Sequence, residues 1–331
     1  MGIRCSLTKS DLSDTQLSDV HGRWRQEDLA GADPGWTNRS FGYDLAGRLT
    51  SVAESQESGG CDTRTYGFDV NSNRTSSVFF PADVSGSCST LTASSQSLSL
   101  SFDAADRLLA SGSGVGVVYD AWGRTTTLPA GLTSTPVAGD ASSTYFVNDL
   151  VRSLTQGGGT RTWVLDPANR LASMSTTGLG STGLVNHYSD VSSDSPAWTS
   201  DTSSAGVVTT RRYVPGFVGL LAEAATTGGV TSTVVELTGL HGDVLRTTTP
   251  SATLAPDGVG VWADEFGRVL DATGSLTTGP RYGWLGGKQR ATDTGVTGLT
   301  LMGVRLYSPI LKLCKVMCEK VYKLSCYLGY S

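Results

Sequence analysis

The sequence predicts an all-β fold, an irregular array of β-hairpins with a short helix at its C-terminal end. Three observations lead to this prediction. An element of Asp, three further residues and Arg recurs along the chain. Apolar and polar residues alternate in front of these elements with the two-residue period of a half-buried strand. The 331 residues include 41 Gly and only 17% charged residues, which suits strands and tight turns better than helices with charged faces.

Residues 1–36 form an N-terminal segment whose structure the sequence does not define. This segment lacks the apolar run of a signal peptide. No stretch of the chain approaches the ~18 apolar residues of a membrane-spanning helix. We expect a protein that is either cytosolic or exported by a route that this segment does not show.

Residues 37–235 carry most copies of the repeated element and form the hairpin array. Asp, Asn and Gly tolerate the left-handed conformations of hairpin turns, and an Asp side chain can bond turn amides. Because Asp and Arg can pair across such a turn, each copy is interpreted as a structural staple and not as an active site. The staple residues are Tyr43, Asp44, Arg48, Asp69, Arg74, Asp103, Arg107, Tyr119, Asp120, Arg124, Asp166, Arg170, Asp264 and Arg268. Two copies are irregular: Asp69 reaches Arg74 with one extra residue, and a weaker copy uses Asn148 and Arg152.

These elements resemble the Rhs/YD-repeat family, named for its Tyr-Asp dipeptide. Residues 43–49 and 119–124 carry the dipeptide in its turn context. Residues 240–245 resemble the His-x-Asp segment of the family's repeat-associated core, and residues 282–290 and 298–309 resemble its closing signature. The resemblance covers residues 37–309 and assigns residues 236–309 to that core. It implies a partial β-cocoon, a shell of strands around a C-terminal toxin payload in a bacterial, secreted or cell-surface protein.

In this family the payload is often released near a Gly-Arg and Asp-Pro stretch, which does not follow residue 309 here. We therefore assign no cleavage residue and expect the payload to be absent. The expected function is that of a non-catalytic shell fragment that contains or displays a payload, extracellular or at the cell surface after a cytoplasmic stage. Its expected partner is a C-terminal toxin payload or a cell-surface glycan or receptor. The alternative is an extracellular carbohydrate- or cell-surface-binding module that uses exposed aromatic residues such as Trp122 and Trp163.

Cys61 and Cys88 lie in polar connections on either side of one repeat. A disulfide between them would close a loop of about 26 residues, and the alternative is two free thiols in a reducing compartment. The sequence contains no Gly-x-Ser-x-Gly elbow, and Cys314, Cys318 and Cys326 lack the spacing of zinc ligands. We expect no catalytic residue, no cofactor and no metal. The net charge of -5 argues against a nucleic-acid partner.

Residues 310–331 differ in character from the rest of the chain. Apolar residues recur at steps of three and four from Ile310 to Leu328, as on one face of a helix. Lys residues fall largely on the other face. Three interpretations stay open: a helix that docks on the shell, a helix that contacts a membrane surface, and a truncated or frame-shifted end.

Overall fold

The computed structural model describes residues 4–9, 12–31, 37–56, 59–82, 86–91, 95–111, 116–133, 138–178, 182–216, 219–250, 263–269, 281–292, 298–302 and 305–311. Residues 312–331, which contain most of the predicted C-terminal helix and the cysteines at its end, lie outside these ranges. The described chain is almost entirely antiparallel strand and turn, so the all-β prediction is confirmed. Over these ranges, no helix has the length and apolar character needed to cross a membrane.

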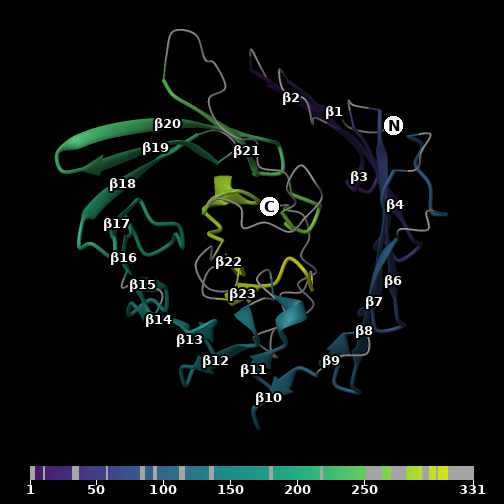
Figure 1. Ribbon diagram of the computed structural model, residues 1–331. Coiled ribbons are helices and arrows are strands. Elements are labelled where there is room, and N and C mark those ends of the chain that lie inside the picture. The colour runs from purple at the N-terminus through teal and green to yellow at the C-terminus, as the bar shows by residue number, and fades with distance from the viewer. Residues whose placement is uncertain are drawn as a thin grey trace. The chain divides into compact units, whose positions relative to one another are not determined.

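The chain divides into two compact units, residues 1–115 and residues 116–331. The first unit is one nine-stranded antiparallel sheet in which each strand pairs with the next along the chain (Figure 1). Its strands are β1 (Arg4–Lys9), β2 (Leu12–Ser18), β3 (Trp24–Gly31), β4 (Thr37–Tyr43), β5 (Leu49–Gln56), β6 (Cys61–Phe68), β7 (Arg74–Phe80), β8 (Gln96–Phe102) and β9 (Leu108–Ser111). Strand β3 pairs with β4 through Gln26 and Ser40, so the strands that precede residue 37 continue the same sheet.

The second unit contains a twelve-stranded sheet in the same consecutive order and a separate two-stranded sheet. The large sheet comprises β10 (Val118–Tyr119), β11 (Thr125–Leu128), β12 (Ala141–Tyr145), β13 (Val151–Gln156), β14 (Gly159–Leu165), β15 (Leu171–Thr177), β16 (Thr182–His187), β17 (Trp198–Thr202), β18 (Val208–Pro215), β19 (Leu220–Thr227), β20 (Val230–Thr238) and β21 (Val244–Thr248). The small sheet is β22 (Thr300–Met302) with β23 (Arg305–Tyr307), and the large sheet curves around it (Figure 1). Short 3-10 turns occur at η1 (Ala130–Leu132) and η3 (Gly286–Lys288).

The strands bury one face, as the alternating sequence predicts. In β4, Thr37, Arg39 and Phe41 are buried while Asn38 and Ser40 are exposed. Successive side chains of a strand point to opposite faces, so this pattern places every second residue in the core. The core of the first unit includes Val52, Tyr66 and Leu100, and that of the second includes Leu128, Leu154 and Trp163.

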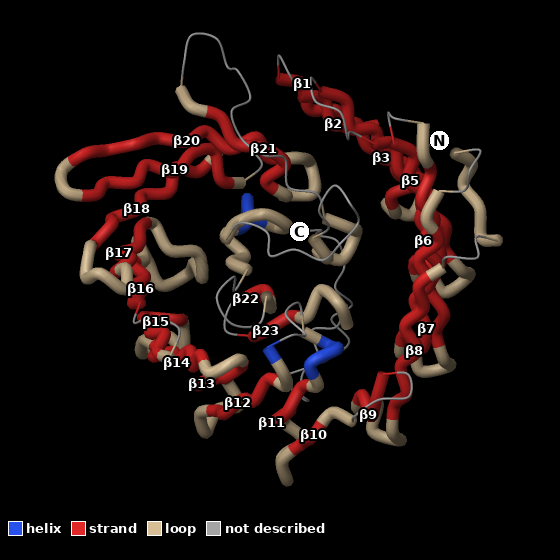
Figure 2. Tube along the Cα trace, viewed as in Figure 1, coloured by secondary structure: helices blue, strands red, loops and turns tan. Residues whose placement is uncertain are grey.

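Ten connections in the described residues share one five-residue turn, and strands alternate with such turns along both sheets (Figure 2). The first residue of the turn donates its N–H to the carbonyl of the fifth, and the fourth donates to the carbonyl of the first. The fourth residue has a positive φ each time, which makes a type I turn followed by a left-handed residue. Gly occupies six of these fourth positions, and Ser72, Asp106, Asp149 and Asn169 occupy the others. The turns are 19–23, 44–48, 69–73, 103–107, 120–124, 146–150, 166–170, 203–207, 239–243 and 264–268.

Candidate functional site

The turn that begins at Asp44 shows how the repeat is built. Asp44 Oδ1 accepts the backbone N–H groups of Ala46 and Arg48, each at 2.9 Å. Its Oδ2 atom accepts the Arg48 Nε–H at 2.6 Å. One carboxylate therefore satisfies two turn amides and holds the guanidinium that follows, which is why the repeat places Arg four residues after Asp.

The same contacts recur in both units. Asp103 holds Arg107, Asp120 holds Arg124, and Asp166 holds Arg170, with Nε to Oδ2 distances of 2.7 to 2.8 Å. Asp19 and Arg23 form an identical staple that the sequence analysis missed, because it lies in the segment treated as undefined. Its signal was present in the sequence as Asp, three residues and Arg.

Two assignments made from the sequence are wrong in register. Asp69 pairs with Asn73, not across an extra residue with Arg74: Asn73 Nδ2 donates to Asp69 Oδ2 at 3.0 Å within a turn of the usual length. Arg74 lies buried at the start of β7, with its guanidinium 5.8 Å from the Tyr66 ring. An amide can therefore replace the guanidinium at the fifth turn position.

The weaker copy assigned to Asn148 and Arg152 lies two residues earlier in the structure. Its turn runs from Phe146 to Leu150, so the first and fifth positions hold apolar residues. The last copy keeps the backbone pattern, since Asp264 Oδ1 accepts the Arg268 N–H at 2.9 Å. The Arg268 Nε atom is buried without a hydrogen-bond partner among the described residues.

Several staples also contact the next turn along the same edge of their sheet. Arg48 Nη1 donates to the Asp69 carbonyl at 2.9 Å, and its guanidinium lies 4.9 Å from the Phe68 ring centre. Arg23 stacks on Tyr43 in the same way at 5.0 Å. The aromatic residue in front of Asp is therefore the cation–π platform for the Arg of the preceding unit. This contact explains the Tyr-Asp dipeptide.

The second unit repeats these links between turns. Arg124 Nη1 donates to the Phe146 carbonyl at 3.3 Å, and its guanidinium lies 5.1 Å from the Tyr145 ring. Asn148 Nδ2 then donates to Asn169 in the following turn at 3.0 Å. We call such a row of linked turns a turn ladder. Its hydrogen bonds and cation–π contacts join one turn to the next.

Hydrogen bonds lower the pKa of several staple carboxyl groups. The backbone N–H of Arg48 is the strongest influence that holds the pKa of Asp44 below its ordinary value, and the Arg48 side chain acts in the same direction. At Asp19 burial raises the pKa, but hydrogen bonds from Arg23 and His21 and the Arg23 charge outweigh it and lower the pKa to about 2. A carboxyl group whose pKa is lowered by folding stabilises the folded state at pH values above the pKa of the unfolded chain. This stabilisation is lost as the pH falls through the folded-state pKa.

The first unit carries a line of buried charges across four strands. Arg39 of β4 lies between Glu27 of β3 and Glu54 of β5, at 3.5 and 3.4 Å. Arg64 of β6 continues the line with an ion pair to Glu54 at 2.5 Å. All four side chains are buried. The charges alternate in sign along the line, so each is compensated by its neighbours.

Residues 281–292, the closing segment, dock on the second sheet through the turn 239–243. Asp243 Oδ1 lies 2.9 Å from His241 Nδ1 and accepts the Leu285 N–H at 2.7 Å. The Gly287 N–H donates to the Gly242 carbonyl at 2.8 Å. The His-x-Asp segment therefore provides acceptors that fix the closing segment, and the structure brings together two sequence stretches that the resemblance had singled out.

Trp284 anchors the closing segment in the second unit. Its ring stacks on Tyr307 of β23, with centroids 5.1 Å apart, and lies 6.2 Å from the His241 ring. Tyr307 in turn donates its hydroxyl to the Phe266 carbonyl in the last staple turn. Gly267 of that turn has φ +81°, and a Cβ atom there would lie 2.4 Å from the indole. Only glycine fits between this turn and Trp284.

A second contact fixes the other end of the closing segment. Arg281 Nη1 bonds Asp201 of β17 at 3.2 Å, and the Tyr282 ring meets Tyr213 of β18 edge-on at 5.5 Å. Burial raises the pKa of Tyr282. The segment thus contacts β17 and β18 at one end and the turn before β21 at the other.

Glu236 of β20 is a buried acid on the same sheet. Its Oε2 atom has no hydrogen-bond partner within the described ranges, and burial, with the Glu223 charge, raises its pKa to about 7. A raised carboxyl pKa favours the neutral form in the folded state, so stability falls as the pH rises from the unfolded pKa of 4.5 toward 7.

The pH dependence of stability tests the assignment of Glu236. We expect the midpoint temperature of thermal unfolding of the second unit to fall as the pH is raised from 5 to 8. In Glu236→Gln this fall should disappear; an unchanged pH profile would contradict the assignment.

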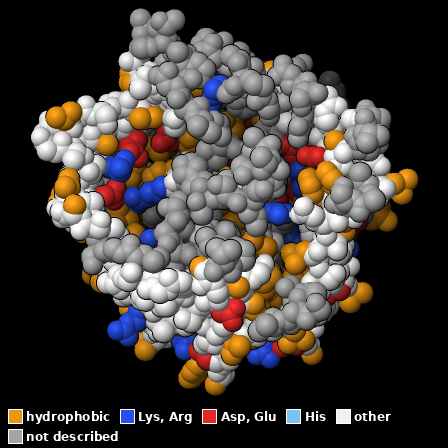
Figure 3. Space-filling model, in the orientation of Figure 1, with side chains coloured by type: hydrophobic (Ala, Val, Ile, Leu, Met, Phe, Trp, Pro, Cys, Tyr) orange, Lys and Arg blue, Asp and Glu red, His pale blue; other side chains and the backbone are white. Residues whose placement is uncertain are grey.

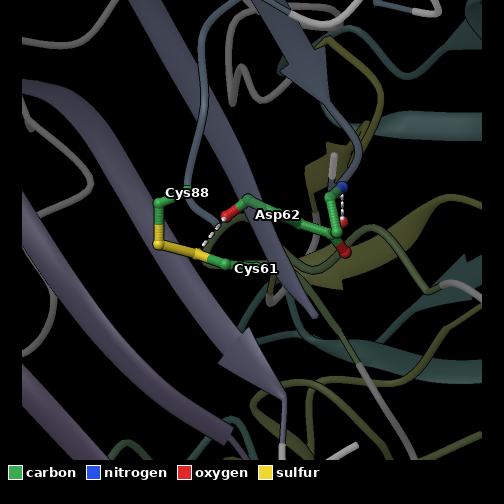
Figure 4. The surroundings of a disulfide bond; sticks show 4 residues. Cys61, Asp62 and Cys88 are labelled. Atoms are coloured by element: carbon green, nitrogen blue, oxygen red, sulfur yellow. Dashed lines mark hydrogen bonds between the residues drawn. A yellow bond between two sulfur atoms is a disulfide. The ribbon is translucent and has the colours of Figure 1, made fainter. Parts of the chain in front are cut away.

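Cys61 and Cys88 form a disulfide, with Cα atoms 4.7 Å apart (Figure 4). It joins the start of β6 to the connection between β7 and β8. Asp62 reinforces the same junction, because its Oδ1 atom accepts the Ala82 N–H at 2.9 Å. Of the two alternatives left open by the sequence, the structure has the disulfide.

The disulfide should contribute strongly to the first unit. The bridged residues are 27 apart, and loop closure of this size stabilises by ~3 kcal/mol in the chain-entropy description. We expect the variant Cys61→Ala/Cys88→Ala to unfold at a correspondingly lower guanidinium concentration. A reducing agent should shift the wild-type midpoint and leave that of the variant unchanged; equal midpoints of both oxidised proteins would refute the prediction.

The described residues contain no group of three or more His, Cys, Asp or Glu side chains placed to hold a metal ion. What they contain is an antiparallel array with stapled turns and a closing segment. These features define the class of protein by its fold, as an antiparallel β array with stapled turns.

No protein-family model and no curated protein matches the chain. Solved structures do share its fold. The structure of TcdB2-TccC3 without its hypervariable C-terminal region matches 94% of this chain with a TM-score of 0.66 and 13% identity. A structure of TcdB2-TccC3 matches 94% with a TM-score of 0.65 and 13% identity. The chain spans 16% of the length of each. The array therefore shares its fold with a segment of these chains.

Proposed function

We propose that the chain is a non-catalytic wall segment of an Rhs-type shell, which contains or displays a C-terminal payload. The observation that carries the proposal is the turn ladder. Arg48 and Arg124 each fix their own turn and the following one, so these joints cross-link neighbouring turns at the edge of the sheet. A wall that isolates a payload needs this property, because an edge that opens locally exposes both the payload and its own unpaired strands.

The disulfide supports a location outside the cytoplasm, since such bonds persist in oxidising compartments. The fold shared with the TcdB2-TccC3 chains supports the toxin-related part of the proposal. The proposed partner is a payload carried on the same polypeptide or a cell-surface receptor. The proposal includes no cofactor and no reaction step.

Trypsin, which cleaves after Arg and Lys, tests whether the ladder closes the edge. We expect cleavage after Arg48 in the native protein to be at least ~100-fold slower than in the unfolded chain, because cleavage follows local opening. Arg48→Lys keeps the charge and the cleavage site but loses the fork that bonds Asp44 and the next turn. It should be cut at least ~10-fold faster there. Rapid native cleavage at Arg48, or equal rates in both proteins, would overturn the wall function.

A glycan- or cell-surface-binding function is the second candidate, and one residue favours it. Trp122 is 79% exposed at the tip of turn 120–124. Trp163, the other aromatic residue suggested from the sequence, is buried in the core of the second unit and cannot contact a glycan. Binding to a glycan array that is lost in Trp122→Ala would support this function. Binding that the substitution leaves unchanged would remove Trp122 from it.

A further inference from the structure

The second unit carries a row of charged side chains that leads from the closing segment to Glu236. Arg281 of the closing segment bonds Asp201 of β17, and Arg211 of β18 donates to the same carboxylate, with Nε 2.6 Å from Oδ2. Arg211 also bonds Glu223 of β19. The signs alternate along these four residues, so each charge is compensated by a neighbour. In the space-filling view, acidic and basic side chains lie next to one another in the region of β17–β19 (Figure 3).

Glu236 breaks this alternation of charge. Glu223 pairs with Val234 across β19 and β20, so Glu236 lies two positions further along on the same face. Diagonal neighbours of this kind are about 7–8 Å apart. Glu236 is 6% exposed, and its Oε2 atom has no hydrogen-bond partner in the part of the chain that the structure describes. When ionised, Glu236 is therefore a buried charge beside a like charge, which costs free energy.

The described titratable and charged side chains that share this part of the face come from four elements. They are Glu223 of β19, Arg211 and Tyr213 of β18, Asp201 of β17, and Arg281 and Tyr282 of the closing segment. Both arginines are already paired with Asp201 and Glu223. Thr247 of β21 lies opposite Glu236, and Arg246 pairs with Leu237 and so points to the other face of the sheet. Burial, together with the Glu223 charge, raises the pKa of Glu236 to about 7.

The closing segment is attached to the second sheet on both sides of Glu236. At one end, Arg281 joins the row of charges. At the other end, Gly287 lies against Thr238, which follows Glu236 by two residues in β20: a Cβ atom on Gly287 would lie 2.7 Å from Thr238 Cγ2. We propose that Glu236 is a proton-operated latch for the closing segment, which stays docked while Glu236 is neutral and opens when Glu236 is ionised.

Solvation of the carboxylate explains the direction of the latch. An ionised Glu236 regains water when the closing segment lifts from β20, whereas the neutral acid gains little. With a pKa of 4.5 when solvated and about 7 when buried, Glu236 supports docking fully below pH 4.5 and progressively less as the pH rises through 7. The segment is therefore docked in acidic surroundings and loosened at neutral pH. This inference concerns the segment alone and does not depend on the wall function.

Hydrogen exchange of the full chain tests the latch, with rates corrected for the dependence of intrinsic exchange on pH. Protection of residues 281–290 should fall at least ~10-fold from about pH 5 to about pH 7.5. In Glu236→Gln, whose side chain stays neutral, protection should remain throughout at the value that the wild type has at the acidic pH. The matched control is Asp149→Asn, which removes an acid that is 51% exposed in turn 146–150. It should keep the pH dependence of the wild type.

Strands β12 and β13 of the same unit distinguish opening of the closing segment from unfolding of the unit. Their protection should change less than ~3-fold over the same pH range. An equal loss of protection in these strands would overturn the latch, because Glu236 would then act on the whole unit. A closing segment whose protection is independent of pH in the wild type would also overturn it, as would Glu236→Gln with the pH dependence of the wild type.

Discussion

Replacement of Glu54 by Ala is expected to destabilise the first unit by about 3–5 kcal/mol, because it leaves Arg39 and Arg64 buried without their shared counter-charge. Glu54 is 2% exposed, so water cannot take the place of the carboxylate. Hydrogen exchange measured peptide by peptide is the suitable readout, since a chain of two units need not unfold in one step. Protection in β4, β5 and β6 should fall by a factor of roughly 100 or more.

Two comparisons make the Glu54 experiment specific. Glu54→Gln keeps the shape of the side chain and removes its charge, so it should cost less than Glu54→Ala but more than ~1 kcal/mol. Exchange in β14 and β15, which belong to the second unit, should not change in either variant. Loss of protection in Glu54→Ala below a factor of about three would mean that the buried line of charges is not needed for stability.

Removal of Trp284 should destabilise the second unit by about 3–5 kcal/mol, the usual cost of truncating a buried aromatic side chain. The indole lies between Tyr307 and Gly267, so its removal leaves a cavity there. Denaturation followed by circular dichroism near 215 nm should show an earlier transition for this unit in Trp284→Ala. Exchange in the closing segment should rise first.

Trp122→Ala is the control for Trp284→Ala. It removes the same side chain from an exposed turn and should change stability by less than about 0.5 kcal/mol. Gly267→Ala gives an independent test, because a methyl group there would collide with the indole. If Trp284→Ala unfolded at the same denaturant concentration as Trp122→Ala, the closing segment would not be anchored by its tryptophan.

The repeat allowed the array and most staples to be predicted, because both follow from local rules. Alternation fixes the strand faces, and an Asp with a left-handed residue and an Arg fixes the turn. The errors arose at turns that have the same backbone geometry as the others but different residues at the first or fifth position. At Asp69, Asn73 donates the hydrogen bond that an Arg side chain donates in the other turns. A search for Arg therefore shifted the predicted register by one residue, to Arg74. Residues 146–150 form the same backbone turn with apolar residues at its first and fifth positions, so no Asp or Arg marks it in the sequence.

The burial of polar residues could not be predicted in the same way. Glu27, Arg39, Glu54 and Arg64 are spread over 38 positions of sequence and meet only through strand pairing. Conversely, Trp163 looked suitable for ligand binding, but β14 turns it into the core. The closing segment was recognisable as a stretch, yet its contacts with residues 239–243 and 264–268 depend on how the chain returns to the sheet.

The direction of the contacts in the turn ladder has a consequence for how such proteins change in length over evolution. A two-strand unit with the full Tyr-Asp and Arg pattern contributes an aromatic ring toward the preceding unit and an Arg donor toward the following one, as Tyr43 and Arg48 do. A duplicated or deleted unit therefore restores its own joints, whereas an insertion of one residue shifts donor against acceptor. Copy number can drift freely while spacing within a unit stays fixed, and mutational damage at one joint stays confined to its neighbours.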